Sequence, residues 1–144
     1  MLSLLKSIFN KRPIVFTAPS GYMPQAQTKL SAGYDVKAKK NYKLIKGVKA
    51  LIGTNVKIRS CSKDYYLELH PRSSLRALLG CEGIGIIDSD YSKEIMMIVI
   101  PDKDYIINRG ERIAQLIPKK VLRVTNCEIK QNTRIGGIGS SGNL

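Results

Sequence analysis

A short segment near the middle of the chain, Ile87-Asp-Ser-Asp-Tyr91, places two carboxylates beside an aromatic ring. It follows a glycine-rich stretch over residues 80–85, so we expect it to lie on a turn. Asp88 is suited to orient and deprotonate a water molecule, which is general-base chemistry. An Asx turn would use Asp88 and Asp90 as backbone hydrogen-bond acceptors instead, and the spacing by itself favours that simpler interpretation.

A second segment, Pro71-Arg-Ser-Ser-Leu75, combines a guanidinium with two hydroxyls at the predicted start of a helix. These groups and the free backbone amides of a first helical turn suit the oxygens of a phosphate. A capped surface helix explains the same residues without any ligand. Both interpretations stay open for this segment taken alone.

The chain lacks the residues of a dedicated zinc site or a disulfide framework. Its three cysteines, Cys61, Cys81 and Cys127, form no CxxC pair, and His70 is the single histidine. Zinc sites need clusters of such ligands, and an odd number of cysteines argues against a disulfide scaffold. We therefore expect an intracellular, reducing location.

Short strands separated by glycine and proline must position the two polar segments. Tyr65–His70 alternates with a period of two, as a half-buried strand does. Ile95–Ile100 is continuously apolar and predicts a strand buried on both faces, followed by a hairpin turn at Pro101–Asp104. The other predicted strands are Pro13–Thr17, Gly33–Ala38, Tyr42–Ile45, Val48–Ile58, Tyr105–Asn108 and Arg112–Pro118, with a turn region at Pro19–Pro24.

One helix is predicted over Ser73–Leu79, because Leu75, Leu78 and Leu79 share a face and Gly80 can end it. One short helix in an otherwise β chain favours a jelly roll or a distorted β-barrel. The length of 144 residues fits a single domain.

The last residues, 133–144, are rich in glycine and serine. Glycine gains nothing from ordering by itself, so we expect a C-terminal arm that only a phosphate or a neighbouring subunit would order.

The charge balance favours acidic partners, because 24 Lys and Arg stand against 11 Asp and Glu and give a net charge of +13. The basic residues are spread along the chain, which is more typical of solvated strand faces than of a DNA-reading surface. The apolar stretch within Met1–Arg12 is too short for a secretory signal, and no apolar run approaches the length of a membrane span. We expect a soluble protein.

Four segments of the chain resemble the first four sequence motifs of the dUTPase family, in the same order and with similar spacing. The resemblance to that family extends over Ala32–Gly142. A fifth, partial match lies in the glycine-rich terminus. The segments are Ala32–Val36 (AGYDV), Pro71–Leu75 (PRSSL), Gly85–Tyr91 (GIIDSDY), Arg112–Ile117 (RIAQLI) and Thr133–Gly142 (TRIGGIGSSG).

The resemblance implies an all-β, homotrimeric jelly-roll enzyme that hydrolyses dUTP to dUMP and pyrophosphate with Mg²⁺, each active site drawing on more than one subunit. Asp88 corresponds to the catalytic residue that holds the attacking water and contacts the deoxyribose 3′-OH. Tyr91 corresponds to the ring under the sugar that leaves no room for a 2′-OH, and Asp35 would position magnesium through water. The other substrate-contacting positions so implied are Arg72, Ser73, Ser74, Gly85, Gln115, Arg134, Ile138, Gly139 and Ser140.

Three positions depart from the family pattern. Ile138 stands where the family carries a phenylalanine that closes over the uracil, and losing that stacking is expected to weaken affinity by up to roughly two orders of magnitude. The family arginine falls at Thr133, with Arg134 one residue later. Glu82 stands where many relatives carry asparagine near the base.

Two other functions compete with hydrolysis. The related dCTP deaminase needs a carboxylate at the position of Ile98, and an isoleucine cannot transfer protons. A dUTPase-like module that binds nucleotide, protein or nucleic acid with little turnover is suggested by the altered arm and the charge, and a steep salt dependence of nucleic-acid binding would support it. The expected intracellular location is the cytoplasm or the nucleus, of a host cell if the protein is viral.

Overall fold

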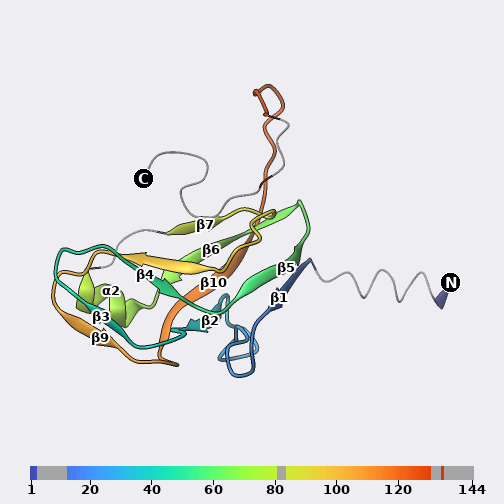
Figure 1. Ribbon diagram of the computed structural model, residues 1–144. Coiled ribbons are helices and arrows are strands. Elements are labelled where there is room, and N and C mark those ends of the chain that lie inside the picture. The colour runs from blue at the N-terminus through green and yellow to red at the C-terminus, as the bar shows by residue number, and fades with distance from the viewer. Residues whose placement is uncertain (3–12, 81–83, 131–133, 135–144) are drawn as a thin grey trace.

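The computed structural model describes residues 1–2, 13–80, 84–130 and 134. Its strands form four antiparallel sheets around one apolar core, with the helix α2 (Ser73–Leu79) at one end (Figure 1). The strands are β1 (Ile14–Thr17), β2 (Tyr34–Lys37), β3 (Tyr42–Leu44), β4 (Ala50–Gly53), β5 (Lys57–Cys61), β6 (Tyr65–Pro71), β7 (Gly85–Ile87), β8 (Met96–Val99), β9 (Tyr105–Ile107) and β10 (Arg112–Lys120).

The largest sheet has the order β2-β10-β6-β7, and three two-stranded sheets, β1-β5, β3-β9 and β4-β8, complete the fold. Strand neighbours such as β10 and β2 are far apart in the sequence, as expected where strands cross between the layers of a jelly roll. The predicted all-β jelly-roll class is therefore confirmed. In the described part of the chain the strand ladders do not close into a barrel.

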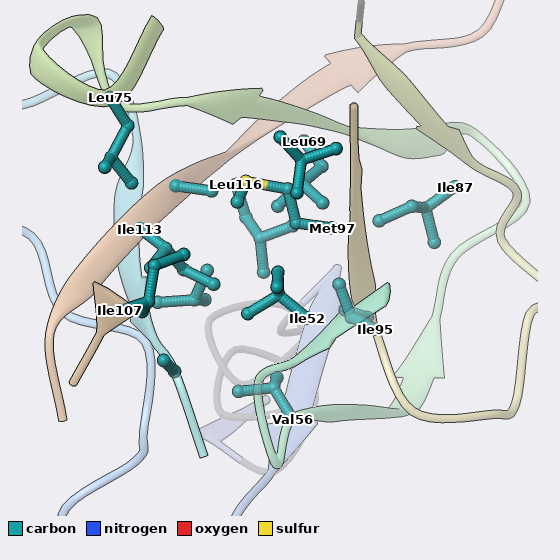
Figure 2. Close-up of a cluster of buried hydrophobic side chains, with 14 of the residues drawn as sticks. Ile52, Val56, Leu69, Leu75, Ile87, Ile95, Met97, Ile107, Ile113 and Leu116 are labelled. Atoms are coloured by element: carbon teal, nitrogen blue, oxygen red, sulfur yellow. The ribbon is translucent and has the colours of Figure 1, made fainter. Parts of the chain in front are cut away.

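Aliphatic side chains from every sheet meet in the core (Figure 2). Ile52 of β4, Met97 of β8 and Leu116 of β10 are at most 2% exposed. Burying one such side chain stabilises the fold by about 1.5–3 kcal/mol. The predicted alternation of β6 is confirmed, because Leu67 and Leu69 point into this core while Glu68, between them, faces outward.

The prediction that Ile95–Ile100 is buried on both faces is wrong. Met97 and Val99 are buried, but Ile98 between them is 43% exposed. The strand β8 pairs only with β4 and covers the core with one face, so its cross-strand neighbour Leu51 is also exposed. A continuous apolar run does not distinguish this arrangement from a fully buried strand.

Three further features differ from the sequence prediction: the bounds of one strand, the nature of one turn and the buried face of the helix. Val48–Ile58 is two strands, because Asn55 adopts a positive φ of 60° and turns the chain between β4 and β5. Pro101–Asp104 joins strands of different sheets and is not a hairpin turn, since β8 pairs with β4 and β9 with β3. Leu78 is 37% exposed because α2 is covered by the core only along the side of Leu75 and Leu79.

The predicted end of α2 is confirmed at Gly80. This residue has a φ of 62°, in the left-handed region that favours glycine, and its N–H donates to the carbonyl of Arg76. None of the helices in the described ranges is long and apolar enough to cross a membrane.

Candidate active site

Polar residues from three distant segments meet at one end of the largest sheet. Asp35 of β2 lies opposite Gln115 of β10, and Gln115 lies opposite His70 of β6. Arg72 follows β6 directly, and its N–H donates to the carbonyl of Ile113, which fixes the start of α2 beside the same row. We name the group Asp35, Arg72, Ser73, Ser74 and Gln115 the sheet-end cluster.

Side chains within the sheet-end cluster are held by specific contacts. The carboxylate of Asp35 is 16% exposed, and its Oδ2 lies 3.3 Å from Nη1 of Arg112. Nη1 of Arg72 donates to the carbonyl of Arg112 at 3.4 Å. The amide of Gln115 packs over Gly33, where a Cβ atom would overlap its Oε1. The backbone ladder and these contacts fix both an anionic and a cationic group here.

The first turn of α2 is not capped by any side chain among the described residues. Arg72 occupies the N-cap position, and Ser73 and Ser74 are exposed. The helix start is exposed, as the explanation by a capped surface helix expects, but the cap is missing, because neither hydroxyl accepts from the backbone amides that a cap would satisfy. Both hydroxyls face solvent, where they can contact an anion.

Asp88 lies on the turn predicted from the sequence, directly after β7. The N–H of Tyr91 donates to the carbonyl of Asp88 at 3.1 Å and closes this turn. The carboxylates of Asp88 and Asp90 are 61% and 63% exposed. Gly85, at the start of β7, lies opposite Leu69 of β6. The turn therefore presents its carboxylates to solvent.

Tyr91 is the buried member of the same turn. Its side chain is packed against the core, and its hydroxyl donates to the carbonyl of Glu94 at 2.9 Å. Burial raises the pKa of the phenol above its ordinary value, so the hydroxyl stays protonated and remains a donor at neutral pH. The ring thus has a defined orientation beneath the exposed carboxylates.

Arg134, from the C-terminal region, lies over this turn. Its Nη1 is 2.8 Å from Oδ2 of Asp88 and 3.3 Å from Oδ1 of Asp90, and its guanidinium carbon is 5.3 Å from the centre of the Tyr91 ring. It contacts the carboxylates of its own chain and is not at the sheet-end cluster. Five other positions singled out in the sequence lie outside the described residues: Glu82, Thr133, Ile138, Gly139 and Ser140.

A groove of about 550 Å³ opens beside the Asp88 turn. Four of its lining residues were indicated by no sequence motif, because only the pairing of β6 with β7 and the chain leaving β10 bring them here: Tyr65, Tyr66, Val121 and Arg123. The complete lining is Tyr65, Tyr66, Ile86, Asp88, Ser89, Asp90, Val121, Arg123 and Arg134.

Within one chain the Asp88 turn and the sheet-end cluster do not meet. Ile87 lies opposite Leu67 on β6, whereas the cluster begins after Pro71, four residues further along that strand. At about 3.3 Å per residue this is a separation of roughly 13 Å. Figure 1 shows α2 at one end of β6 and the chain leaving β7 at the other.

Comparison with known proteins gives the same family as the motifs. The family model described as dUTPase matches residues 20–142. The deoxyuridine 5′-triphosphate nucleotidohydrolase of Debaryomyces hansenii is 33% identical over 129 residues, covering 83% of this chain and 80% of the relative. The enzyme of the same name from Leptospira interrogans is 35% identical over 109 residues, covering 71% of this chain and 74% of the relative.

Solved structures share the fold. A point mutant of the dUTPase from phage phi11 of S. aureus, described with a structural Mg(II) ion, has a TM-score of 0.73 at 19% identity and covers 85% of this chain and 100% of its own. A point mutant of the dUTPase from Staphylococcus bacteriophage 80alpha, solved with dUpNHpp, has a TM-score of 0.72 at 20% identity and covers 84% of this chain and 98% of its own. Because the family model spans most of the chain and the motifs fall inside it, this protein belongs to the dUTPase family.

Proposed function

We propose that this protein hydrolyses dUTP to dUMP and pyrophosphate, which removes dUTP and supplies the precursor of dTTP. One observation carries the proposal: an exposed carboxylate, Asp88, and a buried ring, Tyr91, face the same guanidinium at the edge of a groove. That arrangement places a proton acceptor above a flat apolar surface, as a sugar with a reacting phosphate requires. The names of the curated relatives support the same reaction.

Asp88 is the general base in this proposal. Its exposed carboxylate accepts a proton from water as the water attacks the α-phosphorus, and pyrophosphate leaves. Tyr91 packs under the deoxyribose and occupies the space that a 2′-OH would need. Arg72, Ser73, Ser74 and Gln115 hold the phosphates, and Gly85 and Arg134 complete the contacts to substrate. Positioning and charge stabilisation then carry most of the rate.

Magnesium fits the sheet-end cluster as an ion held largely through water. Asp35 offers a hard carboxylate oxygen there, with Oδ2 already paired to Arg112. Among the described residues no group of three or more metal-ligating side chains comes together. Mg²⁺ commonly keeps several waters and binds substrate phosphates, and when bound it would neutralise phosphate charge beside Asp35.

A homotrimer is part of the proposal, because the sheet-end cluster and the Asp88 turn lie at opposite ends of β6 in one chain. A site containing both is formed where the turn of one subunit meets the cluster of another. The odd number of cysteines, with no CxxC pair, supports an intracellular location.

Pyrophosphate release from purified protein tests the activity. We expect turnover of dUTP with Mg²⁺ and much less with dCTP, dTTP or UTP. Asp88→Asn deletes the base but keeps its shape, so kcat should fall by about 10²–10⁴ while dUTP binding changes little. Protein inert on all four nucleotides would refute the catalytic proposal and favour a binding module, and full activity of Asp88→Asn would show that another group activates the water.

A further inference from the structure

The orientation of the Tyr91 ring depends on the backbone three residues later. The hydroxyl of Tyr91, whose side chain is packed against the core, donates to the carbonyl of Glu94 at 2.9 Å. Arg134 lies over the ring on the side of the Asp88 carboxylate. Whatever fixes the carbonyl of Glu94 therefore also fixes the surface that Tyr91 offers to a ligand.

The side chain of Glu94 leaves the turn and is held at both carboxylate oxygens. Oε2 lies 3.0 Å from Nζ of Lys39, and Oε1 accepts the N–H of Asn55 at 3.0 Å. The carboxylate is 20% exposed, and the ammonium of Lys39 is 33% exposed. A partly buried carboxylate with two charge-assisted bonds holds its position better than an ordinary surface ion pair.

The backbone beside Glu94 is bound to the same part of the fold. The N–H of Ile95 donates to the carbonyl of Val56 at 2.8 Å, and the buried hydroxyl of Thr54 donates to the carbonyl of Ile95 at 2.6 Å. Asn55, between Thr54 and Val56, has a positive φ, and its N–H donates to the Glu94 carboxylate. The turn between β4 and β5 thus holds Glu94 through side chain and backbone.

Lys39 is fixed to that turn as well. Its N–H donates to the carbonyl of Gly53 at 2.9 Å, and its aliphatic chain crosses Gly53 so closely that a Cβ atom there would lie 2.6 Å from Cε of Lys39. Lys39, Asn55 and Glu94 therefore form one unit, which we name the Glu94 clamp. None of its three residues is among those proposed to bind phosphate or to take the proton.

We propose that Glu94 is a positioning residue for sugar discrimination: with Lys39 and Asn55 it fixes the carbonyl that holds the Tyr91 hydroxyl, and so keeps the ring where a ribose 2′-OH has no space. The inference rests on the proposed function, in which Tyr91 packs under the deoxyribose. If the clamp is broken the ring can tilt, and the space beneath C2′ widens. Discrimination between dUTP and UTP should then fall more than turnover of dUTP does.

The test compares kcat/KM for dUTP with kcat/KM for UTP in the full-length protein. Glu94→Ala and Lys39→Met should each lower the ratio of the two values, by about tenfold or more for Glu94→Ala, because a small displacement of a positioned group has a large effect. Glu94→Gln keeps an acceptor for the Asn55 N–H and should restore part of the ratio. Matched controls, Glu128→Gln and Lys40→Met, change the same residue types outside the clamp and should leave it unchanged.

Tyr91→Phe removes the same hydrogen bond from the other side. It should lower the ratio as Glu94→Ala does, and the double variant should lower it no further, because both changes break one interaction. A merely structural role for Glu94 would lower the melting temperature and leave the ratio intact, which would overturn the inference. Should Glu94→Ala fail to fold, Lys39→Met and Glu94→Gln carry the same comparison.

The two proposals fail in different ways. A wild-type protein inert on dUTP overturns the proposed function. A wild-type protein that hydrolyses dUTP and rejects UTP, with clamp variants that reject UTP equally well, overturns only the role of Glu94.

Discussion

The sheet-end cluster and the Asp88 turn are built in different ways. Asp35 and Gln115 lie on paired strands, and Arg72 is bonded by its N–H to β10, so the hydrogen-bond ladder of the largest sheet places residues proposed to bind magnesium and phosphate. The Asp88 carboxylate lies on an exposed turn. Among the described residues it is restrained by individual contacts, such as those of the Tyr91 hydroxyl and the Arg134 guanidinium, and not by a strand ladder.

This difference suits two tasks. Binding a triphosphate with little loss of entropy favours donors whose positions are set before the ligand arrives, which a sheet provides. Taking a proton from water favours a carboxylate that water can reach, which an exposed turn provides. Since the two regions lie apart in one chain, their assembly into one site is the feature most open to experiment.

Mixing two inactive variants tests whether one active site is assembled from two subunits. Asp88→Asn disables the turn and Arg72→Ala disables the cluster, so each variant alone should be nearly inactive. If each site joins the turn of one subunit to the cluster of another, random mixing in equal amounts should restore about a quarter of wild-type activity, because one interface in four combines two intact halves. Subunits are exchanged by mild denaturation and refolding, and pyrophosphate release is measured.

The control for mixing is refolding each variant by itself, which should restore nothing. Mixtures that stay inactive although mass analysis shows mixed trimers would mean that each site lies within one chain. The roughly 13 Å between the two regions would then have to close by a movement of the β7 end.

The Arg134 guanidinium allows a sharper test of the turn. Arg134→Ala should lower kcat/KM for dUTP by roughly 10–100-fold, the value of a lost bond to a charged group, because the proposed contact to substrate disappears. Thermal stability should change little, since the bond to Asp88 is an exposed ion pair. Arg109→Ala removes the same charge at an exposed site where the guanidinium contacts Tyr22, and it should have little effect.

Arg134 and Asp88 could instead be coupled only as an ion pair of the free protein. In that case Arg134→Ala would raise the affinity for dUTP, because the carboxylate would no longer have to exchange the guanidinium for the sugar. A measured decrease in KM for this variant would refute the substrate contact.

The sequence predicted the elements that carry the site better than the way they are paired. Alternation in Tyr65–His70 and the glycine after Leu79 are local signals, and both predictions are confirmed. The interpretation of Ile95–Ile100 and Pro101–Asp104 failed because burial and pairing depend on which distant strand is the neighbour. Periodicity within one segment contains no information about that neighbour.

The sequence likewise predicted some residues of the candidate site and missed others. Motif order and family resemblance named Asp35, Arg72, Asp88 and Gln115, and the register of the sheet accounts for the proximity of three of them. The Glu94 clamp was missed, because its three members come from loops and a turn that follow no motif, and their proximity follows from the fold of β4 and β8.

A substitution at Gly33 tests how strictly the strand pairing of the largest sheet positions the sheet-end cluster, and its expected effect on activity is smaller. A methyl group at this buried glycine would overlap the amide of Gln115 and lie 3.1 Å from Cγ1 of Ile117. Gly33→Ala should therefore displace Gln115 and raise KM for dUTP by several-fold, up to about tenfold, with kcat less affected. Steady-state kinetics with dUTP measures both constants.

A double variant separates displacement from general damage. If Gly33→Ala acts by moving Gln115, then adding it to Gln115→Ala should raise KM no further, because the group it displaces is absent. Additive effects of the two changes would show that the methyl group disturbs the strand itself, and that the contact between Gly33 and Gln115 is incidental.

The smallest effect is expected on the outward face of β6, beside the sheet-end cluster. Hydrogen bonds from His70 and then from Tyr66 lower the pKa of Glu68 below its ordinary value of 4.5. A carboxylate whose pKa is lower in the folded state stabilises the fold above the unfolded-state value, and that stabilisation is lost as the pH falls through the folded-state value. Glu68→Gln should therefore lower the melting temperature at neutral pH, and its difference from wild type should shrink as the pH falls below 4.5.

Thermal melts of wild type and Glu68→Gln over that pH range measure this difference, with Glu128→Gln as the exposed control. A difference that stays constant with pH would mean that Glu68 stabilises the fold through the packing of its side chain, and that its charge does not contribute.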